Sequence, residues 1–332
     1  MKKIIAIVLV CVLALAMVAA CGKSEATNSG SQNTSSNTTS NTSSNASSNA
    51  SSNTSSNTTS NTPPNTQNNP APPPANDFDA TRVIAVYTRE EGSGTRDAFV
   101  SLTGVGEDMY IEAIVNNETN QILTNVETND NAIGYVSIGS LNPSVKALEI
   151  DGVIPSNETV TNGSYTLQRP FLLCMNSDNE SNPLVQDFIS FIMSAEGQDI
   201  VATKWTAINS SAPRYAPSNM SGTLKVGGST SVEPLMQSLS QAYRAHNPNV
   251  VIEISLGGSG TGISEATSGV LNIGMSSRAL RDSEREALTG VDIALDGVAV
   301  IVNPANPINA MTIDQVKEIF TGEITRWNQV IG

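Results

Sequence analysis

Short apolar runs typical of strands alternate with longer amphipathic runs typical of helices from residue 82 to the end of the chain. The clearest strand-like runs, each with the helix-like run that follows it, are 83–87 with 96–102, 224–228 with 233–245, 250–258 with 263–271, and 297–304 with 312–320. Strands that alternate with helices are characteristic of βαβ units. The pattern therefore predicts an α/β fold with largely parallel sheets.

The first 79 residues follow a different pattern. Two lysines, an apolar run over 4–16 and small residues before Cys21 predict a bacterial lipoprotein signal peptide over 1–20, with Cys21 as the lipidated first residue of the mature protein. An ordinary signal peptide with an incidental cysteine is the alternative. Residues 21–79 are rich in Ser, Thr, Asn and Pro and carry few apolar residues, which predicts a disordered tether. We expect an extracytoplasmic protein that a lipid anchors to the cell membrane without spanning it.

The composition argues against several kinds of partner and site. The formal net charge of −14 argues against a nucleic-acid partner. Once Cys11 is removed with the signal peptide, Cys174 is the single thiol of the folded part, so no disulfide within this part and no cysteine metal site is expected, and its apolar surroundings predict a buried small hydrophobe. The single histidine, His246, lies in a polar run that predicts an exposed position, and no residue cluster has metal-ligand spacing.

Three strand-to-helix junctions share one composition of glycines and hydroxyl residues. They cover residues 89–99, 227–235 and 257–266, and the run 272–280 joins them as a fourth hydroxyl-rich segment. Glycine allows close backbone approach, and Ser or Thr suits the position before a helix begins. Helix N-termini with free N–H groups bind anions, and ligands of open α/β sheets lie beyond the carboxyl ends of the strands. The junctions therefore predict an anion site.

Other functions of glycine-rich loops are poorly supported. No lysine follows these glycines as a P-loop requires, and the spacing of a dinucleotide site is absent. A serine hydrolase or phosphatase remains as an alternative class, but the sequence lacks a G-x-S-x-G elbow and a second histidine. We expect no enzyme activity and no cofactor.

Several segments resemble one family, the phosphate-binding proteins of the PstS type, which serve phosphate ABC transporters. The similar segments include "VGGSTSVEPLMQSLSQAY", "SLGGSGTGISEATSGVLNIGMSSRAL", "IDQVKEIFTGEITRWNQV", "TREEGSGTRDAF" and "NAIGYVSIGSL". The resemblance implies a two-lobed type II periplasmic-binding-protein fold that closes on inorganic phosphate in a central cleft and then docks on an ABC permease in the membrane. A tethered anion-binding sensor or surface module without a permease, and a binder of another tetrahedral oxyanion such as sulfate, are the alternatives.

The order of these segments differs from that of the family, in which the "GGSTS" segment comes first. Moving residues 222–332 ahead of 82–206 restores the family order, so we interpret the chain as a circular permutation with a linker at 207–221. The alternatives are a fragment of a broken tandem gene and a swapped dimer in place of a monomer. The resemblance implies a lobe I of 143–206 with 222–303 and a lobe II of 80–142 with 304–332, with crossings near 141–144 and 302–304.

The ligand contacts follow from the matching motifs of the family. The resemblance implies phosphate contacts from lobe I by Thr230, Ser231, Ser259 and Ser277, and from lobe II by Arg89, Ser93, Gly94 and Thr95. Arginine suits the charge-assisted contact with phosphate. Glu91 either orients Arg89 or is solvated. Arg278 is expected on the surface, and the alternative is that it adds positive field to the site.

Ser277 departs from the family, because many members have an aspartate there that accepts a hydrogen bond from protonated phosphate. A carboxylate at this position would repel fully ionised sulfate, which has no proton to donate. A serine repels sulfate less, so selectivity against sulfate is expected to be weaker here.

Overall fold

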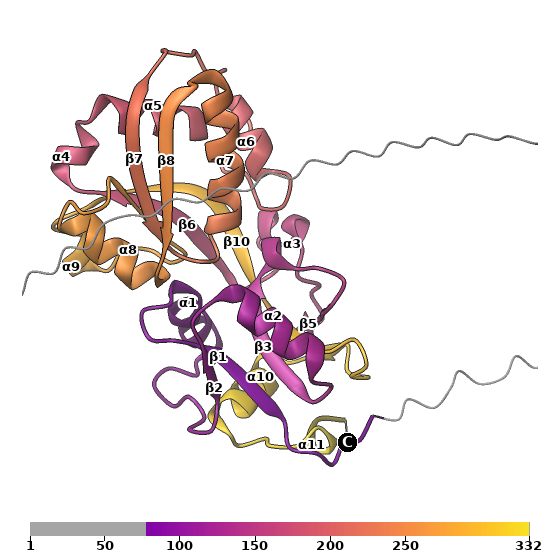
Figure 1. Ribbon diagram of the computed structural model, residues 1–332. Helices are drawn as coiled ribbons and strands as arrows, with labels where there is room; N and C mark the ends of the chain where they lie inside the picture. The colour runs from indigo at the N-terminus through magenta and orange to yellow at the C-terminus, as the bar shows by residue number, and fades with distance from the viewer. Residues whose placement is uncertain (1–77, 332) are drawn as a thin grey trace, which may run out of the picture. The chain divides into compact units, whose positions relative to one another are not determined.

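The computed structural model describes residues 78–331 (Figure 1). The predicted signal peptide, Cys21 and all but the end of the predicted tether lie outside these residues. Across the described stretch, every helix is too short or too polar to cross a bilayer.

The strands form one mixed sheet in the order β2-β1-β3-β10-β6-β9-β7-β8, with β4 beside β10 and a separate pair of β5 and β11. Each antiparallel pair of named strands includes β6 or β10, and the remaining pairs are parallel. The expected parallel arrangement thus holds on the two flanks of the sheet and not at its centre. The strands are β1 Ala85–Arg89, β2 Ile114–Asn116, β3 Ala132–Ser137, β4 Lys146–Ala147, β5 Glu149–Ile150, β6 Gln168–Met175, β7 Ser221–Gly228, β8 Asn249–Leu256, β9 Ile273–Ser276, β10 Thr289–Val302 and β11 Ala310–Met311.

Helices connect the strands and begin at residues that suit a helix start. Asn182 caps α5, and Pro183 follows at the first helical position, where its missing N–H costs nothing. The helices are α1 Gly94–Thr103, α2 Thr119–Thr128, the short 3-10 helix η1 Ile138–Ser140, α3 Asn157–Thr161, α4 Ser177–Glu180, α5 Pro183–Ile192, α6 Ala195–Val201, α7 Glu233–His246, α8 Gly258–Thr267, α9 Asp282–Arg285, α10 Ile313–Thr321 and α11 Asn328–Ile331.

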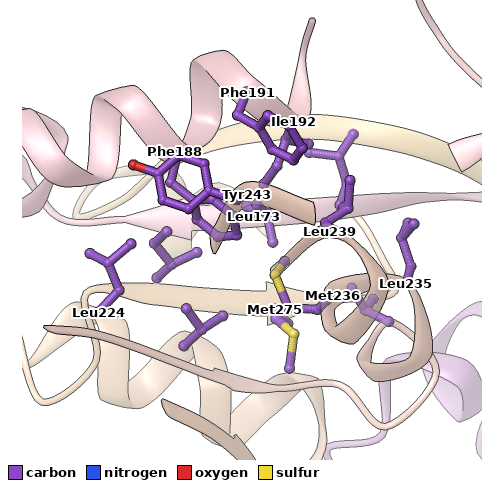
Figure 2. Packing of buried hydrophobic residues seen from close by; sticks show 14 of the residues in the cluster. Leu173, Phe188, Phe191, Ile192, Leu224, Leu235, Met236, Leu239, Tyr243 and Met275 are labelled. Atoms are coloured by element: carbon purple, nitrogen blue, oxygen red, sulfur yellow. The ribbon is translucent and has the colours of Figure 1, made fainter. Parts of the chain in front are cut away.

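Two hydrophobic cores divide the described residues into two lobes. One core gathers buried residues from 171–294, including those of α5 and α7 that pack against β6, β7 and β9 (Figure 2). The other gathers residues from 84–167 and 298–327, including those of α1 and α10. Smaller apolar clusters lie under α8 in the first lobe and under α2 in the second. We therefore define lobe I as residues 168–297 and lobe II as residues 78–167 with 298–331.

Strand β10 runs through both lobes. Its first part, 289–297, pairs with β6 of lobe I, and its last part, 298–302, pairs with β3 and β4 of lobe II. The crossings therefore lie at 167–168 and 297–298, whereas the sequence placed them near 141–144 and 302–304. Residues 143–167 join lobe II because Leu148, Val160 and Tyr165 are buried in its core.

A buried ion pair stabilises this crossing. Arg169 on β6 donates two hydrogen bonds to Asp296 Oδ2 on β10, at 3.1 and 3.0 Å, and Ser137 of lobe II donates to Asp296 Oδ1 at 2.7 Å. Both charged side chains are almost inaccessible. Burial raises the pKa of Asp296 and lowers that of Arg169, and both shifts disfavour the charged forms, whereas the contacts between the two side chains act in the opposite direction. The strands that join the lobes are thus tied by polar contacts as well as by the sheet.

The predicted linker at 207–221 packs closely against lobe I. Tyr215 and Tyr243 both donate to Asp187 Oδ2 at 2.6 Å, and the amide of Ala195 donates to the carbonyl of Pro213 at 2.8 Å. Asp187 lies on α5 and Tyr243 on α7, so the segment is held across two helices. Apart from Ser221, where β7 begins, residues 207–221 contain no helix or strand.

The last described residues lie beside the first described residues (Figure 1). The amide of Asn328 donates to the carbonyl of Ala80 at 2.8 Å, and the amide of Ile84 donates to the carbonyl of Thr325 at 2.8 Å. The rings of Phe78 and Trp327 are 6.4 Å apart. The first and last described segments therefore belong to one structural unit of lobe II.

Candidate anion-binding site

The three predicted junctions meet where the two lobes face each other. The loop after β1 leads into α1, the loop after β7 leads into α7, and the turn after β8 leads into α8. Ser93 caps α1 by accepting a hydrogen bond from the amide of Arg96 at 3.4 Å. Gly258 begins α8 with a φ of 82°, a conformation that side chains rarely adopt. The helix starts thus bring polar N-termini to one place.

Hydroxyl groups from opposite lobes contact each other in this site. Thr95 Oγ1 of lobe II lies 2.8 Å from Ser231 Oγ of lobe I. Within lobe I, Ser259 Oγ accepts from the amide of Ser277 at 3.1 Å and lies 3.4 Å from its hydroxyl oxygen. All four side chains are 0–2% exposed. The hydroxyls therefore form a shared, desolvated cluster between the lobes.

Arg89 provides a buried positive charge, and Thr119 connects it to Ser231 of this cluster. The Arg89 side chain is 2% exposed, and its Nε and Nη2 donate to the two carboxylate oxygens of Glu90 at 2.8 and 2.9 Å. The guanidinium also donates to the carbonyls of Asn116 and Asn117. These contacts fix the plane of the guanidinium, which suits recognition of an oxyanion.

The structure decides between the two alternatives for Glu91, which is solvated, and corrects the expectation for Arg278. Glu90, and not Glu91, orients Arg89, because the turn directs the Glu91 side chain outward, where it is 94% exposed. Arg278 is not a surface residue. It donates to Glu284 through two nitrogens and to Asp97 of lobe II at 2.9 Å, and its side chain is 10% exposed.

Ion pairs at the rim of the site connect the two lobes. Asp97 on α1 accepts from Arg278 and from Arg281 of lobe I, the latter at 2.8 Å. Hydrogen bonds from Arg278 lower the pKa of Glu284, which keeps this carboxylate charged and the guanidinium oriented. The amide of Gly260 in lobe I also donates to the carbonyl of Gly92 in lobe II at 2.8 Å. The described arrangement is therefore a closed one.

Close approach of the lobes depends on the absence of a side chain at Gly94. A Cβ atom at this position would lie 2.3 Å from Ser259 Oγ and 2.8 Å from Ser277 Oγ. Gly94 thus places the N-terminus of α1 directly against the lobe I hydroxyls. All eight residues that the sequence predicted lie in or beside this cluster.

Sequence reasoning missed Glu90 and Thr119. Thr119 is the first residue of α2, is 5% exposed and lies within hydrogen-bond distance of Arg89, Thr230 and Ser231. The sequence does contain a signal for Thr119, since this threonine begins a helix-like run shortly after the short strand at 114–116. This junction lacks glycine and therefore does not share the composition of the other three.

The arrangement suits a small oxyanion. One arginine, several hydroxyls and four helix N-termini converge, and the Glu90 carboxylate is paired with the arginine. Within residues 78–331, no group of three or more His, Cys, Asp and Glu side chains is placed to hold a metal ion. Cys174 is buried in lobe I, as predicted, and burial raises the pKa of its thiol to about 12.

Comparison with known proteins identifies the class. A family described as the PBP superfamily domain matches residues 65–196 and 213–332. The chain therefore belongs to the PBP superfamily, and the predicted two-lobed α/β fold is confirmed. The curated phosphate-binding protein PstS 2 of Streptococcus pneumoniae serotype 4 is 43% identical over 265 residues, which cover 77% of this chain and 90% of that protein.

A solved structure and a more distant relative extend the comparison. The structure, a phosphate-binding protein of a phosphate ABC transporter from Streptococcus pneumoniae, is 42% identical with a TM-score of 0.62, covering 75% of this chain and 100% of that chain. The phosphate-binding protein PstS of Bacillus subtilis is 34% identical over 115 residues, which cover 34% of this chain and 38% of that protein.

Proposed function

We propose that this chain is an extracytoplasmic substrate-binding protein that captures inorganic phosphate between its lobes and delivers it to an ABC permease. The observation that carries the proposal is the buried Arg89, which Glu90 holds in place and which Thr119 connects to the hydroxyls of lobe I. The similarity of the chain to proteins named for phosphate binding supports the choice of phosphate as the ligand. The eight predicted residues, with Arg89 as the charged contact, form the proposed phosphate site. The chain performs no covalent chemistry in this role.

Binding would work by hinge closure at the crossing of β6 and β10. A phosphate held by hydroxyls of both lobes interacts with the closed form more strongly than with an open one, so it shifts the population toward closure. The rim ion pairs of Asp97 act in the same direction. The closed form would then dock on the permease, while a lipid on Cys21 and the tether at 21–79 keep the protein at the membrane.

We also propose that the chain is a circularly permuted form of the family fold. Two observations support this order. Residues 325–328 form backbone hydrogen bonds with residues 80–84. The last described segment therefore lies where the chain of the family would continue into the first described segment. The Bacillus subtilis protein matches about a third of this chain, as expected when one half alone can align in the same order. One alignment covers 90% of the Streptococcus pneumoniae PstS 2, so that relative has its segments in the same order as this chain, which argues against a gene fragment.

The decisive experiment is calorimetric titration of the full chain in detergent with phosphate and then sulfate, with the mass of the species measured in solution. Stoichiometric phosphate binding by a monomer is the expected result. A folded chain that binds neither anion would contradict the proposed function.

A reordered chain with 222–331 ahead of 80–206 is expected to bind phosphate within a few-fold of the natural order, and failure of that chain alone would contradict the permutation. Phosphate uptake by cells that lack the chain tests the permease role.

Replacing Ser277 by aspartate is expected to sharpen selectivity against sulfate. Ser277 is fully buried beside Ser259, so a carboxylate there cannot be screened by water. It would accept a hydrogen bond from the hydroxyl of monohydrogen phosphate and repel sulfate, raising the ratio of the two dissociation constants about 10-fold or more. Competition titrations measure the ratio. Ser277→Asn, uncharged and of similar size, serves as the control, and an equal change in both variants would contradict the charge argument.

Weakening the rim ion pairs is expected to speed phosphate release. In Asp97→Asn, the lobes lose two charge-assisted contacts, but Glu284 still holds Arg278 in place. Because these groups are partly exposed, we expect a loss of affinity of about 3- to 10-fold, mostly in the dissociation rate and smaller at high salt. Stopped-flow displacement measures the rate. Asp282→Asn, on exposed α9, is the control, and an unchanged rate in Asp97→Asn would show that the rim does not stabilise closure.

A further inference from the structure

Thr119 occupies a position that the sequence motifs do not assign. It is the first residue of α2, and the residue before it, Glu118, makes no capping hydrogen bond with its side chain. The Thr119 hydroxyl is not used as a helix cap either. It is directed instead toward the interface between the lobes, where it is buried.

Its hydroxyl connects the arginine to the opposite lobe. Arg89 Nη1 donates to Thr119 Oγ1 at 3.3 Å. The same oxygen lies 3.1 Å from Thr230 Oγ1 and 3.3 Å from Ser231 Oγ, both of lobe I. Since the arginine donates to this oxygen, the hydroxyl proton of Thr119 is available to an acceptor other than Arg89, and in the contacts with Thr230 and Ser231 either oxygen can be the donor.

We propose that Thr119 is a further phosphate-binding residue, which donates its hydroxyl proton to the bound anion and places the N-terminus of α2 as the fourth helix start of the site. This inference rests on the proposed function. A buried donor beside Thr230 and Ser231, which the family resemblance already assigns to the ligand, reaches the same oxyanion. A hydrogen bond to a charged group contributes more than one between neutral groups, so its loss matters for affinity.

The test compares hydroxyl-bearing and hydroxyl-free side chains of equal shape. Thr119→Val retains the branched shape and loses the hydroxyl, whereas Thr119→Ser retains the hydroxyl. Thr124→Val makes the same change on the exposed part of α2. In calorimetric titration of the full chain with phosphate, we expect Thr119→Val to bind about 10- to 100-fold more weakly, and the Ser and Thr124 variants to remain within about threefold of the unmodified chain.

The outcomes separate this inference from the proposed function. Absence of phosphate binding by the unmodified chain would overturn the proposed function itself. Normal binding by Thr119→Val, or equal loss in the Val and Ser variants, would overturn the role of the hydroxyl alone. A direct contact also predicts that the Val change weakens binding in an Arg89→Lys background, whereas no further loss there would show that Thr119 acts only by positioning Arg89.

Discussion

Arg89→Ala is expected to abolish measurable phosphate binding at micromolar protein concentration, a loss of at least about 100-fold. Arg89 is the charged donor of the cluster, and removing one partner of a buried hydrogen-bonded charge pair costs about 2–5 kcal/mol. The substitution also leaves the partly buried Glu90 carboxylate without its partner. An unpaired negative charge then repels the anion that the site should bind. Calorimetric titration of the full chain measures the loss.

Arg96→Ala provides a matched control for this prediction. Arg96 lies on α1 close to the same loop, but its side chain is more exposed, and its contact with Glu91 is at 4.0 Å. This variant is expected to bind phosphate within about threefold of the unmodified chain. Equal losses in the two variants would indicate that general positive charge, and not the oriented guanidinium of Arg89, attracts the ligand.

Gly94→Ala is expected to reduce phosphate affinity by about 100-fold or more, although it adds a single methyl group. That group would meet Ser259 Oγ and Ser277 Oγ well inside contact distance, so lobe II could not approach lobe I as closely. The change removes closure and misplaces the amides at the start of α1 at the same time. Misplacement of binding groups by about 1 Å is sufficient for an effect of this size.

Stability distinguishes this steric effect from unfolding. Gly94 lies within α1, where alanine is otherwise the better helix former, so the melting temperature without phosphate should change by no more than a few degrees. The increase in melting temperature that phosphate produces in the unmodified chain should disappear. Ser101→Ala, on the exposed part of the same helix, should behave as the unmodified chain does. Unimpaired binding by Gly94→Ala would show that the closed contacts are not required.

Much of the site was predictable because its parts are local. A strand followed by glycine and a hydroxyl residue at a helix start predicts both the element boundary and the polar N-terminus, as Ser93 and Ser259 illustrate. The carboxyl ends of parallel strands bring such junctions together. The fold class followed from the same alternation of strands and helices.

The parts that escaped prediction depend on long-range packing. Arg278 finds its partner Asp97 181 positions away in the sequence, so its burial has no local signal. Whether Glu90 or Glu91 faces Arg89 is decided by the rotation of one turn. The crossing points could not be located because the apolar pattern of β10 is the same in both lobes, although its partners change from β6 to β3 at residue 298.

The division of the two cores along the chain has a consequence for synthesis on the ribosome. The core of lobe I comes from the uninterrupted stretch 171–294, so all of it has been made before the second part of lobe II begins. The core of lobe II needs residues 84–167 and also 298–327. Its first part therefore leaves the ribosome early and waits, with the β3 edge unpaired until the end of β10 arrives. The lobe that starts first is thus completed last, and a chain arrested before residue 298 carries a complete lobe I core beside an open sheet edge.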